Sequence, residues 1–200
     1  MPYKTRRITP NDLMAPHEYS RVRAQRRQEL ESTKTLRRIQ VGPFITFYFE
    51  SYDTIWFQIQ EMLHIEGGGL AQIPGELEAY NPLIPQGREL VATVMLEIGE
   101  PIRRAKVLGV LGGIENTAFI LVQGEIINGI PEIDLNRTKS DGKTSSVHFL
   151  HFPFTREQIG SFCNFKNKVV IGFSHPDYSH MTVVSGAVQL SLSKDFAAMS

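Results

Sequence analysis

Short runs of β-branched and aromatic residues recur through the chain from residue 41 onward, and this pattern constrains the fold most strongly. Such residues favour strands because their side chains pack well on a pleated surface. The runs that we assign to strands are residues 41–50, 54–60, 90–98, 117–122, 145–152, 168–173 and 181–184, and a turn within residues 124–131 leads into one more. Helical segments are inserted between them. We therefore predict a single α+β domain over residues 1–200, with a largely antiparallel sheet.

The first two runs are separated by the short polar segment Ser51-Tyr52-Asp53, and this spacing predicts a β-hairpin. From about Ile59 the second strand is expected to pass into a helix, which the three glycines at 67–69 would end. These glycines lack the strand–loop–helix context and the lysine of a phosphate-binding loop, so they do not indicate a nucleotide site.

Capping residues mark the helices. Thr9, Pro10 and Asp12 are typical of a helix N-terminus, and a second helix is predicted over residues 17–34. Further helices are predicted over residues 74–80, 101–111, 155–165 and 185–198, the last with a strand over 188–192 as its alternative.

The chain is neutral as a whole, but its charges are unevenly distributed. It contains 21 Lys+Arg and 21 Asp+Glu residues. Residues 1–38 hold ten basic and four acidic residues, a net charge of +6, so the other eleven basic and seventeen acidic residues give −6. We therefore distinguish a basic helical arm, residues 1–38, from a sheet-containing body, residues 39–200. This complementarity predicts salt-sensitive docking of the arm on the body or on a second copy.

Two alternatives remain open for the arm. It could bind a partner or a polyanion instead, although nucleic acid is disfavoured because the chain lacks the overall positive charge that phosphate binding favours. A homodimer could form through an exchanged arm or through an exposed apolar sheet.

Composition excludes several classes of protein. With 42% hydrophobic and 10% aromatic residues the chain is globular in composition, and no apolar run approaches the length of about 18 residues that predicts a membrane span. The charged N-terminus is not followed by an apolar run, so a cytoplasmic location is expected. Cys163 is the single cysteine, which excludes an intramolecular disulfide and a multi-cysteine metal site.

Glu61, Glu97, His148 and His175 form a candidate metal site. Imidazole and carboxylate groups suit iron, zinc or manganese. Glu61 and His64 also have the spacing of the Glu-x-x-His pair in di-iron bundles, although one such pair is equally typical of a solvated helix face. His148 lies on an apolar face of its predicted strand, where a histidine is more often a hydrogen-bonded core residue than a ligand.

Two glutamines and two arginines form a second candidate site, for an anionic or polar ligand. Glu50, at the end of one predicted strand, and Glu97, late in another, belong to the same polar cluster. In a strand, Gln58 and Gln60 lie on one face together with Trp56, and the alternative is that this face is solvated. On the helix predicted over residues 17–34, Arg23 and Arg26 share one face. Arginines on the inward side of a helix need carboxylate or phosphate partners.

Four segments carry a resemblance to a known family. They are residues 58–63 (Gln-Ile-Gln-Glu-Met-Leu), 78–85 (Glu-Ala-Tyr-Asn-Pro-Leu-Ile-Pro), 144–150 (Thr-Ser-Ser-Val-His-Phe-Leu) and 175–178 (His-Pro-Asp-Tyr). In these segments the chain resembles an uncharacterised bacterial family of about this length, known as a domain of unknown function. The genes of that family often neighbour those of rubrerythrin-like di-iron proteins and iron–sulfur proteins. The resemblance therefore implies a redox or oxidative-stress setting and such proteins as partners, but no reaction.

Three functional hypotheses follow. In the first, the chain is a cytoplasmic accessory protein that binds a ligand or partner in that redox setting. In the second, it is a metal-dependent enzyme with a His/Glu site. In the third, the basic arm binds a polyanion.

Overall fold

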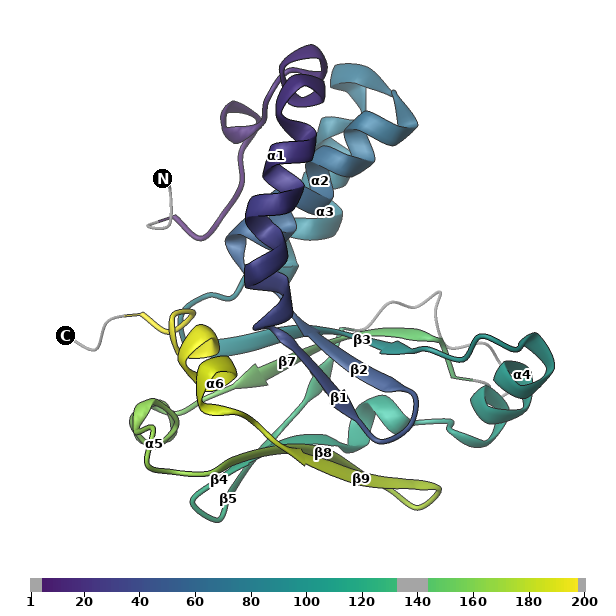
Figure 1. Ribbon diagram of the computed structural model, residues 1–200, viewed down its shortest axis with the longest axis vertical. Coiled ribbons are helices and arrows are strands. Elements are labelled where there is room, and N and C mark those ends of the chain that lie inside the picture. The colour runs from purple at the N-terminus through teal and green to yellow at the C-terminus, as the bar shows by residue number, and fades with distance from the viewer. Residues whose placement is uncertain (1–4, 133–143, 198–200) are drawn as a thin grey trace.

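The computed structural model describes residues 5–132 and 144–197, so the first four residues of the predicted arm lie outside it. Within the described residues, nine strands form two antiparallel sheets, and six α-helices lie around them (Figure 1). The predicted α+β fold class is confirmed. The strands are divided between two sheets, however, where the sequence predicted one.

The two sheets differ in size and in strand order. The larger sheet has the order β1-β2-β3-β7-β6 and the smaller sheet the order β5-β4-β8-β9. The strands of the larger sheet are β1 (Arg38–Val41), β2 (Ile45–Phe49), β3 (Glu89–Leu96), β6 (Ile130–Pro131) and β7 (Val147–Pro153). Those of the smaller sheet are β4 (Ala118–Val122), β5 (Glu125–Asn128), β8 (Val169–His175) and β9 (Tyr178–Val183).

The main hydrophobic core lies between the sheets. Alternate residues of β2 point into it, and the ring of Phe47 stacks on Phe173 of the smaller sheet with 5.1 Å between centroids. Gly129 lets the chain pass directly from β5 to β6, because a Cβ atom there would lie 3.0 Å from the Phe152 ring. The other face of the larger sheet is left available for a second layer.

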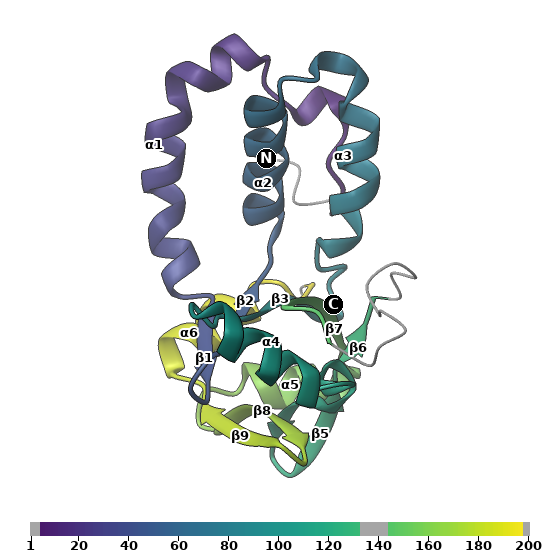
Figure 2. The ribbon, with the colours of Figure 1, turned by 90° about the vertical axis from the view of Figure 1, so that its right-hand side faces the viewer.

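That second layer consists of α1 (Pro16–Thr35), α2 (Tyr52–Glu66) and α3 (Ile73–Tyr80), together with residues 5–14. Figures 1 and 2 show these three helices rising together from one side of the sheets. We call this part the helical layer. It includes α1 from the predicted arm and α2 and α3 from the predicted body. The boundary at residue 38 therefore does not divide the molecule into two parts that are separate in space.

Residues 5–14 hold the helices of this layer together. The Asn81 side chain bonds both the N–H and the carbonyl of Ile8, at 2.8 and 3.0 Å, and the indole N–H of Trp56 donates to the Asp12 carbonyl at 2.8 Å. Thr9 and Asp12 form the predicted capping interaction, but around the short 3-10 helix η1 (Pro10–Asp12).

The remaining helices lie against the sheets. They are α4 (Pro101–Val110), α5 (Arg156–Cys163) and α6 (Gly186–Ser193). The predicted capping box at Thr155 is confirmed, and Ser185 caps a helix, so the strand alternative for residues 188–192 is wrong. None of the helices in the described ranges is both long and apolar enough to cross a membrane.

The predicted hairpin does not form, although residues 45–49 of its first strand are the strand β2. Residues 41–50 contain a turn, where Gly42 has φ +69° and a Cβ atom would lie 2.5 Å from the Tyr178 hydroxyl oxygen. Residues 54–60 belong to α2, which begins after the N-cap residue Ser51. Tyr52, Ile55, Ile59 and Leu63 recur at helical spacing, and they form one buried cluster. Burial of this stripe outweighs the strand preference of its β-branched and aromatic residues.

Candidate functional site

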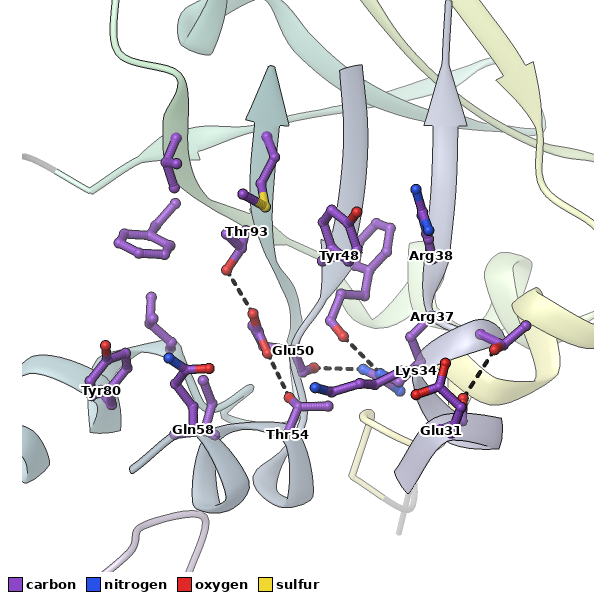
Figure 3. A pocket seen from close by; sticks show the side chains of 17 residues that line it. Glu31, Lys34, Arg37, Arg38, Tyr48, Glu50, Thr54, Gln58, Tyr80 and Thr93 are labelled. Atoms are coloured by element: carbon purple, nitrogen blue, oxygen red, sulfur yellow. Dashed lines mark hydrogen bonds between the residues drawn. The ribbon is translucent and has the colours of Figure 1, made fainter. Parts of the chain in front are cut away.

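A cavity of about 610 Å³ lies between the helical layer and the outer face of the larger sheet (Figure 3). We call it the interlayer cavity. Its size falls in the range that is typical of small-molecule sites. Apolar side chains from both layers supply much of its wall, namely Phe49, Ile55, Leu83, Met95, Val147 and Phe149.

Glu50 places a carboxylate in the wall of this cavity. Its backbone N–H donates to the Val91 carbonyl at 2.8 Å, which extends the pairing of β2 with β3 by one residue. The hydroxyls of Thr93 and Thr54 each donate to one carboxylate oxygen, both at 2.6 Å (Figure 3). Sheet and helix therefore hold the carboxylate together.

The Glu50 carboxylate keeps capacity for further hydrogen bonds. A carboxylate offers about four lone-pair positions, and the two threonines use two of them. Among the residues that the structure describes, no Lys, Arg or His nitrogen lies within 4.0 Å of it. The cavity therefore contains an acceptor that is fixed in position and has no cationic partner among residues 5–132 and 144–197.

Gln58 and Tyr80 add two further polar groups to the cavity wall (Figure 3). Neither side chain makes a hydrogen bond to any residue in the described ranges. Both come from the helical layer, opposite the sheet that carries Thr93. An apolar cavity with a few convergent polar groups is the usual form of a small-molecule site.

Basic residues from the end of the arm line the same cavity, but they are engaged elsewhere. The Lys34 ammonium lies 4.9 Å from the centre of the Phe57 ring. The Arg38 guanidinium lies 5.3 Å from the centre of the Tyr48 ring and 3.7 Å from Glu97. The positive charge of the arm is thus present at the cavity but is not paired with Glu50.

The structure separates the four residues of the predicted ligand site. Gln58 faces the interlayer cavity, whereas Gln60 is buried on another side of α2, because two helical positions differ in direction by about 200°. Arg23 pairs with Glu61, and Arg26 is a surface residue that lies 3.3 Å from Glu29. The shared strand face on which that prediction depended does not exist.

Arg23 does have the carboxylate partner that an inward arginine needs. Its guanidinium donates to both oxygens of Glu61 at 2.8 Å, and the Tyr19 hydroxyl donates to the same carboxylate at 2.7 Å. Arg23 and then Tyr19 stabilise the ionised form, so the pKa of Glu61 falls to about 2 in spite of its burial. The pair joins the arm to the rest of the chain within one molecule.

The two carboxylates of the candidate metal site lie in different hydrogen-bond networks. The Glu61 carboxylate accepts hydrogen bonds from Arg23 and Tyr19, as described above. Glu97 accepts from the hydroxyls of Thr46 and Tyr48 at 2.6 and 2.7 Å, on the outer face of the larger sheet. Burial raises the pKa of Glu97, but these two hydrogen bonds and the charge of Arg38 together lower it by more. The net shift of the pKa is therefore downward.

The two histidines of that candidate site also have separate partners. His148 Nε2 lies 3.0 Å from the Thr144 hydroxyl and 2.9 Å from the Ser145 carbonyl. His175 Nε2 lies 3.2 Å from the Gly112 carbonyl. In the part of the chain that the structure describes, no three His, Cys, Asp or Glu residues are placed to hold a metal ion.

Sequence reasoning named two of the polar groups of the interlayer cavity, Glu50 and Gln58, but missed Thr54, Tyr80 and Thr93. Glu50, at the end of a predicted strand, was included in the predicted polar cluster with Gln58, whereas Thr54 was assigned to a strand of its own. A capping pattern was present: the Ser51 N–H donates to the Thr54 hydroxyl oxygen at 2.8 Å, and the Thr54 N–H to the Ser51 hydroxyl at 3.3 Å. If Ser51 and Thr54 had been interpreted as the start of a helix, Thr54 would have been placed one helical turn after Glu50.

The fold and the cavity define an α+β protein with a largely apolar cavity of ligand size that holds a few polar groups. The chain matches a family model described as "Protein of unknown function (DUF3501)" over residues 7–196, and it belongs to this family. It is similar to the crystal structure of a novel protein of unknown function from Burkholderia pseudomallei K96243. The two are 33% identical with a TM-score of 0.88, over 95% of this chain and 99% of the other. No curated protein matches the sequence.

Proposed function

We propose that this chain is an accessory protein that binds a small molecule in the interlayer cavity, rather than an enzyme with a His/Glu metal site. One observation carries the proposal: the Glu50 carboxylate lies in the wall of a largely apolar cavity, is fixed by two threonine hydroxyls and has no basic partner among the described residues. Gln58 and Tyr80 support it, because they bring further hydrogen-bonding groups to the same space.

The chemistry of these groups indicates the class of ligand. An apolar body would cover Met95 and Phe149, which line the cavity and are only partly covered by protein. A donor on this body, above all an ammonium group, would take the unused lone pairs of Glu50 in a charge-assisted hydrogen bond. The ligand class that we propose is therefore a small organic amine.

The cellular setting is a separate part of the proposal. Rubrerythrin-like and iron–sulfur proteins are the proposed partners, in a redox setting in the cytoplasm, and the support for them is the family resemblance. Binding of a small molecule between two layers would give such a partner a surface that depends on the ligand, because residues of α1, α2 and β3 all line the cavity.

A titration with 2-phenylethylamine, in which NMR chemical shifts are monitored, tests the binding site. We expect the amine to bind the wild-type protein and to bind Glu50→Gln at least about tenfold more weakly, since a charge-assisted hydrogen bond is lost. The uncharged 2-phenylethanol should respond much less to the same substitution. Signals of residues that line the cavity should shift.

Two tryptophan variants provide the matched control. Met95→Trp fills the cavity and should abolish binding, whereas Met181→Trp introduces the same side chain at an exposed position of β9 and should not. The proposal is wrong if the amine does not bind, or if it binds Met95→Trp as tightly as it binds the wild type.

A further inference from the structure

A second cavity, of about 300 Å³, is lined by the start of α1, the end of α2 and the start of α3, which Figure 1 shows at the end of the helical layer remote from the sheets. We call it the distal cavity. It is enclosed by the segment that leads into α1, by the last turns of α2 and by the start of α3. Most of its wall is apolar, and the residues concerned are Leu13, Met14, Pro16, Leu63, Leu70 and Ile73.

Gln60 is the polar group that distinguishes this cavity. Its side chain lines the cavity although the residue is only 2% exposed, and its Nε2 atom is fully buried without a hydrogen-bond partner in the described part of the chain. A buried amide donor without an acceptor destabilises a fold, and a leucine at the same place would not. The unsatisfied donor therefore points to an acceptor that comes from outside the chain.

The neighbours of Gln60 cannot supply that acceptor. Tyr19 also lines the cavity, but its hydroxyl is committed to Glu61, and Glu61 in turn is bonded by Arg23. His64 lines the cavity as well, and its Nδ1 atom lies 3.4 Å from the Ser20 hydroxyl on the surface. The Glu61 carboxylate close by disfavours an anion, and the amide is itself neutral. An uncharged oxygen is the acceptor that these surroundings favour.

We propose that the distal cavity is a second small-molecule site, for an apolar ligand that carries a carbonyl or a similar uncharged oxygen and accepts a hydrogen bond from Gln60. This site is separate from the interlayer cavity. Gln58 and Gln60 belong to the same helix but line different cavities. The two glutamines thus provide a matched pair of variants for a test.

The probes are acetophenone and ethylbenzene, which have similar shapes but differ in the carbonyl oxygen. We expect acetophenone to bind the wild-type protein about tenfold more tightly, as one added hydrogen bond predicts. Gln60→Leu should bind the two equally, and Gln58→Leu should keep the tenfold preference. Met95→Trp, which blocks the interlayer cavity, should leave the preference unchanged.

Free Gln60→Leu protein should be at least as stable as the wild type, because the variant removes an unsatisfied donor. If that variant does not fold, the Gln60 side-chain amide signal in an NMR spectrum of the wild type replaces it, and acetophenone but not ethylbenzene should shift this signal. The inference is overturned if the wild type binds neither probe, if it does not distinguish them, or if Gln60→Leu retains the preference.

Discussion

Two of the ion pairs that tie the arm to the rest of the chain differ in how far their arginines are buried. Arg23 and Glu61 meet in the middle of the helical layer, where the Arg23 side chain is still 36% exposed. Arg37 and Asp195 meet where α1 has ended and α6 has just ended, and their side chains are only 4% and 9% exposed. The Glu61 side chain is 8% exposed, much like that of Asp195, so the difference between the pairs is that Arg23 lies partly in solvent and Arg37 does not.

The pKa values of the two carboxyls move in opposite directions. The donors around Glu61 lower its pKa to about 2. Burial raises the pKa of Asp195 to about 6, although the charge and hydrogen bond of Arg37 oppose this rise. The comparison shows that an arginine partner alone does not decide the direction of the shift, because the loss of hydration is the larger effect in the interior.

Removal of Arg37 should have the largest effect on stability. Its guanidinium bonds the carbonyls of Phe49, Glu50 and Ser191 in addition to the Asp195 carboxylate. Arg37→Met leaves a buried charge and these carbonyls without a donor, so the free energy of unfolding should fall by about 3–5 kcal/mol. Urea denaturation measures this change.

Arg26→Met is the matched control for Arg37→Met. Arg26 is 44% exposed and its partner Glu29 is 49% exposed, so the same substitution should change stability by no more than about 0.5 kcal/mol. Equal losses from the two variants would show that the buried pair is no more important for stability than an exposed one.

The charge distribution predicted that the arm and the body would meet, but not through which residues. Ten basic residues of the arm and seventeen acidic residues of the body allow many pairs. Arg23 selects Glu61 because α1 packs beside α2, and Arg37 selects Asp195 because the chain returns there after α6. Contacts between residues 38 to 158 positions apart depend on the tertiary fold, which the local pattern does not contain.

The helix α2 shows why the candidate sites were incompletely predicted. Its first residues favour strands by composition, and the repeat of Tyr52, Ile55, Ile59 and Leu63 was outweighed by that preference. Once these residues were assigned to a strand, Gln58 and Gln60 fell on one face instead of in two cavities. Helices outside such runs were predicted from local signals: α1 from Pro16 in its first turn, and α5 and α6 from their capping residues Thr155 and Ser185, although α6 is shorter than predicted.

The pH dependence of stability should show the opposite pKa shifts directly. Glu61 is ionised more readily in the folded state, so its contribution is present above pH 4.5 and is lost as the pH falls toward 2. Asp195 binds its proton more tightly in the folded state, so its contribution is present below pH 3.8 and is lost as the pH rises through 6. Denaturation at several pH values should therefore separate the two groups.

The variants Glu61→Gln and Asp195→Asn assign these effects. At neutral pH, Glu61→Gln should be less stable than the wild type by about 1–2 kcal/mol, because charge-assisted hydrogen bonds are weakened. Relative to Asp195→Asn, the wild type should lose stability between pH 4 and pH 7. A constant difference across this range would contradict the raised pKa of Asp195.

Arg38 and Glu97 provide the smallest expected effect and extend the comparison to the surface. Their nearest atoms are 3.7 Å apart and their side chains are 54% and 39% exposed. Arg38→Ala should lower stability by no more than about 0.5 kcal/mol at low ionic strength, and salt of about 1 M should abolish the difference by screening. The loss caused by Arg37→Met should persist in the same salt, since buried charges are screened much less. If salt abolished the stability loss of both variants, the docking of the arm would depend on screened surface charge at Arg37 as well as at Arg38. Burial would then not distinguish the two pairs.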